Sequence, residues 1–211
     1  MSSEEELKKS IEDWRDIVVF NAHNDSLRAF SDATISASPD LDKASGWALA
    51  TSGAIAGLLV SNADKIIGHY YQLENVKLML LLLTVSILCG LAQKTLAVSC
   101  ATHLSVSDAI SLKIKDVLSL YSEHEKSIQD MIEKNNLDVS IDFDFKKVIL
   151  SYANLSPFYI RWFVRKVTAK AFEDPEYSCR RILSVFYRQN IWLILQALAF
   201  ILFILEAILF L

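Results

Sequence analysis

The chain has 211 residues, of which 53% are hydrophobic, and its formal net charge is −4 at pH 7. This acidic balance argues against nucleic acid as an electrostatic partner. The three cysteines stand far apart with no CxxC pair, which argues against a disulfide framework or a metal site. So high a hydrophobic content predicts a few membrane helices beside one small soluble part.

The N-terminal segment, residues 1–38, is acidic and lacks the basic and then apolar order of a signal peptide. Apolar residues at helical spacing predict one amphipathic helix from Ser3 to about Phe20 and a second from Asp25 to Ile35. Neither is long or apolar enough to cross a bilayer. Two interpretations stay open: these cytosolic helices bind a partner or the bilayer surface, or they pack on the soluble part of the same chain.

Residues 39–98 are expected to form a transmembrane hairpin. Ser38 and Pro39 predict a helix start, with the serine as cap and the proline in the first turn. The first apolar run is Ala44 to Ser61 and the second is Val76 to Ala92, separated by a polar turn that contains tyrosines. Because the connection is short, the two runs are expected to be antiparallel.

Small residues are unusually frequent in the first run. Gly53 and Gly57 form a GxxxG pair, a spacing that lets two helix backbones approach closely in lipid. We therefore predict an oligomer interface here, although the same spacing also serves packing within one chain. The predicted interface residues in this run are Gly46, Ala50, Gly53 and Gly57.

Residues 99–174 are expected to form a cytosolic, mostly helical domain. Ser105 and Asp108 predict the start of a long helix that ends near Asn135. Its apolar positions follow alternating steps of four and three, which is typical of a coiled-coil seam. A wider apolar stripe also leaves packing within the same chain open. A seam between two copies would use Ile110, Ile114, Val117, Tyr121, His124, Ile128 and Met131.

The second half of this domain holds two further patterns. Leu137 to Phe145 alternates apolar and polar residues and predicts a short strand, whose aspartates are expected to face solvent rather than hold a cation. Ser156 and Pro157 predict the start of a helix that mixes basic and large aromatic residues. This mixture suits an anionic membrane surface or packing on the domain. The membrane-surface residues would be Arg161, Trp162, Arg165, Lys166 and Lys170.

Residues 175–211 predict one unbroken helix that ends in the third span, Ile191 to Leu211. This run has neither Gly nor Pro, and its helix of about 31 Å can cross a bilayer core of about 30 Å. Its strongly polar residues are Gln196 and Glu206. Three roles stay open for Glu206: pairing with Lys77, lining a water-filled path between subunits, or reaching the outer headgroups.

The charge distribution predicts the orientation. Basic residues are frequent between the second and third apolar runs and scarce in the turn between the first two. The positive-inside rule then places the N-terminus and the middle segment in the cytoplasm and the C-terminus outside. We expect a multi-pass protein of the inner cell membrane.

The usual catalytic signatures are missing from the sequence. It contains no HExxH, GxSxG, phosphate-binding glycine loop or nucleotide fingerprint, and its histidines lie in separate segments. We therefore expect a protein that is not an enzyme and that uses no cofactor or metal.

The run GWALATSGAIAGLLVS, the hairpin after it and the helical middle segment resemble the small multi-span membrane effectors of prokaryotic antiviral defence. This resemblance is one of architecture over the whole chain. It implies a homo-oligomer that perturbs or permeabilises the inner membrane when a cytosolic protein or small molecule engages it. The alternatives are a non-catalytic anchor or scaffold for a soluble partner and a constitutive channel subunit. The expected fold is an all-α membrane protein with three transmembrane helices, a mostly helical cytosolic domain and at most one short β segment.

Overall fold

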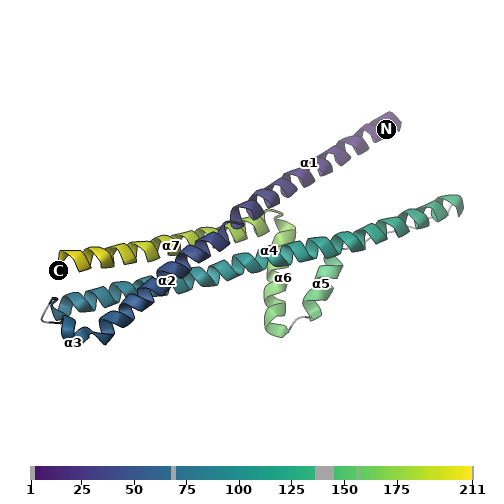
Figure 1. Ribbon diagram of the computed structural model, residues 1–211. Helices are drawn as coiled ribbons and strands as arrows, with labels where there is room; N and C mark the ends of the chain where they lie inside the picture. Colours follow the sequence, from purple (N-terminus) through teal and green to yellow (C-terminus); the bar gives the residue numbers. More distant parts are fainter. Residues whose placement is uncertain (1–2, 68–69, 136–144, 156, 211) are drawn as a thin grey trace. The chain divides into compact units, whose positions relative to one another are not determined.

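The computed structural model describes residues 3–67, 70–135, 145–155 and 157–210 (Figure 1). Within these ranges the chain forms helices and no strand, which confirms the all-α prediction for them. The helices are α1 (Ser3–Ile35), α2 (Ser38–Ser61), α3 (Ala63–Ile66), α4 (Leu73–Asn135), α5 (Phe145–Leu155), α6 (Phe158–Glu173) and α7 (Tyr177–Leu209).

Three helical stretches are long and apolar enough to cross a membrane: the one that ends at Ser61, α4 and α7. The first two predicted apolar runs lie within the first two stretches, and α7 contains the third run up to Leu209. The chain therefore has the composition and helix lengths of a membrane protein.

Two predicted helix boundaries are wrong. α1 continues through residues 21–24, where two helices were expected, and α4 continues through Ser105, where a new helix was expected to begin. Neither stretch contains Gly or Pro, so the intrahelical hydrogen bonds continue, and a local capping pattern does not interrupt them. α4 is consequently 63 residues long, or about 94 Å.

The start of α2 lies where the sequence predicted it, but Ser38 is not its cap. The cap residue is Ala37, which makes no side-chain capping bond, and a proline occupies the first turn. The hydroxyl of Ser38 instead donates to the side chain of Gln189, 2.8 Å away. The Ser38 hydroxyl therefore forms a hydrogen bond to another helix instead of capping its own.

The predicted strand falls almost wholly on residues 136–144, outside the described ranges; its last residue, Phe145, begins helix α5. No pattern in the sequence predicted helix α5. α6 starts directly after Pro157, as expected, and α7 runs without a break to Leu209.

The helices belong to two compact units. The first, called the bundle here, comprises residues up to Leu104 together with Cys179–Leu211; the second, the middle unit, is Ser105–Ser178. In the bundle, α2, the first part of α4 and α7 lie side by side (Figure 1). In the middle unit, α5 and α6 pack against each other as a helical hairpin.

Candidate functional site: a polar core between apolar helices

The interior of the bundle carries a regular series of polar side chains. On α2 the buried residues are Ser38, Ser45 and Ser52, each seven positions after the last. On α7, Gln189 and Gln196 are buried at the same spacing. Seven residues are two helical turns, so each set lies along one side of its helix.

Each glutamine holds one serine at two points. Ser45 donates its hydroxyl to Oε1 of Gln196 at 2.7 Å, and Nε2 of Gln196 donates to the backbone carbonyl of Ser45 at 3.2 Å. Ser38 and Gln189 repeat this pattern at 2.8 and 3.1 Å. We call each such pair a Ser–Gln clasp. Because both clasps join residues with the same sequence separation, α2 and α7 are parallel and in fixed register.

The third helix joins the same core through Ser86 of α4. Its hydroxyl donates to the backbone carbonyl of Gln196 at 3.3 Å and lies 3.1 Å from the hydroxyl of Ser52. Since the Ser86 proton is used on Gln196, Ser52 is the donor to Ser86. The residues Ser52, Ser86 and Gln196 are all fully buried, so their hydrogen bonds replace those that water would make.

Gln93 of α4 is the exception in this core. Its side chain is fully buried, and neither Nε2 nor Oε1 has a hydrogen-bond partner among the described residues. It lies one heptad from Ser86 and so occupies the layer of Ser45 and Gln196. An unsatisfied buried carboxamide costs about 1–3 kcal/mol. The core thus contains one group that destabilises this arrangement.

The end of the bundle next to α3 is apolar. Met79, Leu83 and Phe203 form a buried cluster there, with Ile55 and Leu59 of α2 packed against it. The polar layers therefore stop part of the way along the bundle, and apolar side chains close the core beyond them.

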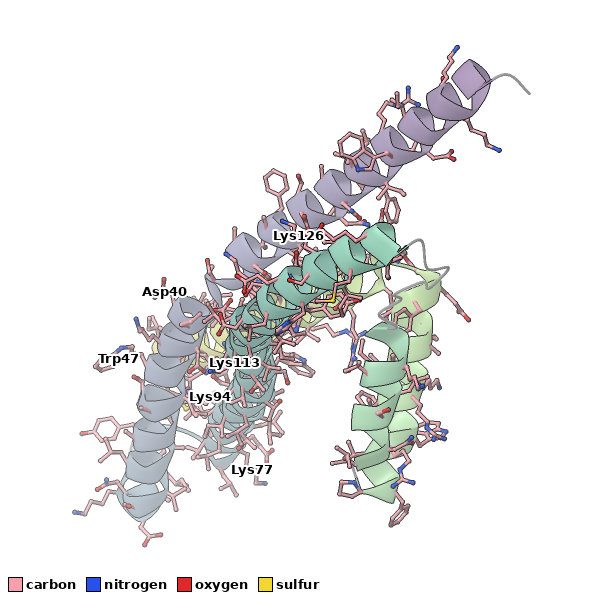
Figure 2. The ribbon with its side chains drawn as sticks, turned by 90° about the vertical axis from the view of Figure 1, so that its right-hand side faces the viewer. Asp40, Trp47, Lys77, Lys94, Lys113 and Lys126 are labelled. Atoms are coloured by element: carbon pink, nitrogen blue, oxygen red, sulfur yellow. The ribbon has the colours of Figure 1, made fainter. Side chains whose placement is uncertain are left out.

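One ion pair lies beside the polar layers. Nζ of Lys94 is 3.1 Å from Asp42, and both side chains are partly buried. Figure 2 shows Lys94 reaching from α4 toward α2. Because α2 and α4 pair Asp42 with Lys94 and Ser52 with Ser86, the two helices are antiparallel, as the hairpin prediction required.

The predicted small-residue interface divides into two parts. Gly46 faces the bundle, where an added Cβ would stand 3.5 Å from Nζ of Lys94. Gly53 and Gly57 face outward, with no other part of the described chain within 4 Å of such an atom, and Ala50 is exposed. Gly53 and Gly57 are therefore open to a second helix, whereas Gly46 serves packing within the chain.

The predicted coiled-coil positions lie on the α4 part of the middle unit. Ile114 and Tyr121 are half-buried there. The other five, Ile110, Val117, His124, Ile128 and Met131, are exposed. Most of the predicted seam therefore lies on the surface of the described chain.

Lys77 and Glu206 do not pair in the structure. Lys77 donates to Glu74 in its own helix at 2.9 Å, and both side chains are exposed. Glu206 is half-buried and makes no side-chain ion pair within the described ranges. The intrachain pair, one of the three roles that the sequence left open for Glu206, is thus not formed in this arrangement.

The basic residues of α6 are partly engaged. Arg161 and Arg165 donate to the backbone and side-chain oxygens of Asn154 in α5, at 2.8 and 2.7 Å. Lys166 lies over the Trp162 ring at 5.0 Å. The sequence left open whether these residues face the membrane surface or pack on the domain, and two of the arginines bind within the α5–α6 hairpin.

The sequence identified Gln196 as a polar residue of the third apolar run, but it did not indicate which residues bind Gln196. The signal that could have identified them is the spacing of Ser38, Ser45 and Ser52, which matches that of Gln189 and Gln196. Comparison with known proteins gives no match to a family model, a curated protein or a solved structure. The function of the chain is therefore inferred from its own residues.

Proposed function

We propose that the chain is a homo-oligomeric effector of the inner membrane, which perturbs or permeabilises the bilayer in response to a cytosolic protein or small molecule. A role in antiviral defence follows from the architectural resemblance noted above. In the proposed topology the N-terminus and the middle unit are cytoplasmic and the C-terminus is outside.

The observation that carries this proposal is the outward face of α2. Gly53 and Gly57 leave open space beside an apolar helix, so the backbone of a second copy can approach closely. The bundle satisfies most of its own polar groups inside, which leaves this ridge as a surface for association.

The polar core supports a membrane-active role over a purely passive one. It extends from Ser38 to Ser52 and Ser86, and Gln93 within it has no partner among the described residues. A simple anchor would gain stability from the Ser–Gln clasps but none from the unbonded carboxamide of Gln93. An assembly that opens this core to water would satisfy Gln93.

The competing function is an anchor or scaffold that recruits a soluble partner. The exposed apolar positions on the α4 part of the middle unit favour it, because Val117, Ile128 and Met131 offer a helical contact surface. This function requires neither oligomer formation nor a change in membrane permeability.

A membrane-potential dye distinguishes the two functions. The chain is expressed under a controlled promoter, with and without its neighbouring genes, and in parallel with Gly57→Leu. The effector function predicts depolarisation by the wild type and its loss in the variant. An unchanged potential at high expression, even with the neighbouring genes present, would contradict it and favour the scaffold.

A further inference from the structure

The α5–α6 hairpin is the most basic part of the chain. From Phe145 to Phe172 the sequence has six basic residues and no acidic one, although the whole chain carries a net charge of −4. This concentration of one sign of charge in a single small element points to an anionic partner.

The turn of this hairpin exposes large apolar side chains. Leu155, at the end of α5, is 84% exposed, and Phe158, at the start of α6, is 82% exposed. Trp162, one helical turn further, is 67% exposed. A patch of this kind at the end of an element marks an interaction site rather than ordinary surface.

The hairpin holds its charges and its apolar tip together. Arg161 and Arg165 bind the oxygens of Asn154 and so fix α6 against the last turn of α5. Lys166 lies over the Trp162 ring, and both side chains are exposed. The tip therefore presents aliphatic and aromatic groups with ammonium and guanidinium groups directly behind them.

We propose that this tip, formed by Leu155, Phe158 and Trp162, docks on the anionic headgroups of the bilayer that the same chain spans. Apolar anchors would enter the headgroup region, and the basic side chains behind them would meet lipid phosphates. A lipid surface fits better than a protein partner because it accepts aromatic, aliphatic and cationic groups together without a shaped pocket.

The chain lengths permit this contact. α6 has 16 residues and extends about 24 Å. The stretch from Tyr177 to Asn190, which separates α6 from the third apolar run, extends about 21 Å as a helix. α6 is thus at least as long as the helical stretch that separates it from the third apolar run. The inference requires that α7 crosses the bilayer and is independent of the effector activity.

A fluorescent label at the tip tests the proposal on the full chain. Leu155→Cys is made together with Cys179→Ser, since Cys89 and Cys100 are buried and poorly accessible to the dye. The protein is labelled with an environment-sensitive fluorophore and placed in nanodiscs of phosphatidylcholine, with or without phosphatidylglycerol. We expect emission to shift to the blue, and brominated acyl chains to quench it, in the anionic discs alone. A label at the exposed Ser122→Cys of α4 should show neither effect.

A pair of charge variants provides the matched comparison. Lys166→Gln with Lys170→Gln should reduce the quenching several-fold, because these lysines are exposed on the hairpin. Lys113→Gln with Lys126→Gln, which removes the same charge from α4 (Figure 2), should leave it unchanged. Equal blue shifts in both lipids without quenching would mean that the tip is buried against protein and would overturn the proposal. In a mixture of donor-labelled and acceptor-labelled chains, energy transfer between the tips without quenching by lipid would also overturn the proposal. It would show that the tip binds a second copy of the chain.

Discussion

Gly90 of α4 lies directly against the side-chain amide of Gln196 in α7. A Cβ at position 90 would stand 2.6 Å from Nε2 of Gln196 and 3.2 Å from Cδ1 of Leu49. That nitrogen also donates to the carbonyl of Ser45, so it cannot move aside without losing half of a Ser–Gln clasp. A glycine is needed here for close approach between helices, and not for an unusual backbone angle.

We therefore expect Gly90→Ala to lower the free energy of unfolding of the bundle by about 1–2 kcal/mol, the cost of one or two interhelical hydrogen bonds in a membrane. The purified protein is unfolded in mixed micelles by increasing the fraction of a denaturing detergent, and circular dichroism monitors the loss of helix. Gly53→Ala is the control, because nothing lies within 4 Å of a Cβ at that position. Equal stability of the two variants would contradict the close packing at Gly90.

The clasp between Ser45 and Gln196 can be tested by a double-mutant cycle. Ser45→Ala and Gln196→Leu should each destabilise the bundle, and their combination should cost less than the sum of the two. The coupling expected for such a bond is about 0.6–1.7 kcal/mol. Ser99→Ala serves as the control partner, since that exposed hydroxyl bonds to Thr95 within its own helix. Strictly additive effects of Ser45→Ala and Gln196→Leu would show that the clasp is absent.

These contacts mark the limit of what the sequence could predict. The three apolar runs were identifiable because length and composition alone decide whether a helix can cross a bilayer. The clasps were not, because hydrogen bonds between α2 and α7 depend on tertiary register. Ser38 illustrates the difference: locally it reads as a cap, but Gln189 takes its hydroxyl. The helix start predicted at Ser105 was wrong for a related reason. A capping pattern begins a new helix only where the preceding helix ends, and α4 continues through this position.

Substitution of Gln93, unlike that of Ser45 or Gln196, is expected to stabilise the bundle. Because neither end of its buried carboxamide is bonded to another described residue, Gln93→Leu should stabilise the bundle by about 1 kcal/mol. The same unfolding titration measures it, with Gln196→Leu as the destabilising comparison. If the effector function is right, this more stable variant should also depolarise membranes less than the wild type. Destabilisation by Gln93→Leu would mean that the carboxamide is satisfied after all.

The outward ridge of α2 gives a prediction about assembly. Gly53→Leu and Gly57→Leu should each reduce the oligomer to smaller species, because a bulky side chain holds the helix backbones apart. Size-exclusion chromatography with light scattering in mild detergent measures the change. Thr51→Leu places the same side chain at another exposed position of α2 and should leave the size unchanged. Wild-type size for both glycine variants would rule out this ridge as the interface.

Glu206 is the acidic residue of the third apolar run and makes no side-chain ion pair in the described part of the chain, while Lys77 is held by Glu74. A charge in hydrocarbon costs on the order of 3 kcal/mol on insertion scales, so its carboxylate needs water or a polar partner. Because Lys77 is paired with Glu74, we expect Glu206 to meet water or a polar partner only in the oligomer.

Glu206→Gln should then leave unfolding of the isolated bundle unchanged and reduce membrane depolarisation. Two measurements separate the possible roles: light scattering for the oligomer and the potential dye for activity. A smaller oligomer would place Glu206 at the contact between copies, and an intact but inactive oligomer would place it on a water-filled path. Lys77→Gln is the matched control and should change neither quantity, because Lys77 is exposed beside Glu74. If Glu206→Gln and Glu206→Leu both assemble and depolarise like the wild type, the carboxylate only reaches the headgroups and the oligomer does not depend on it.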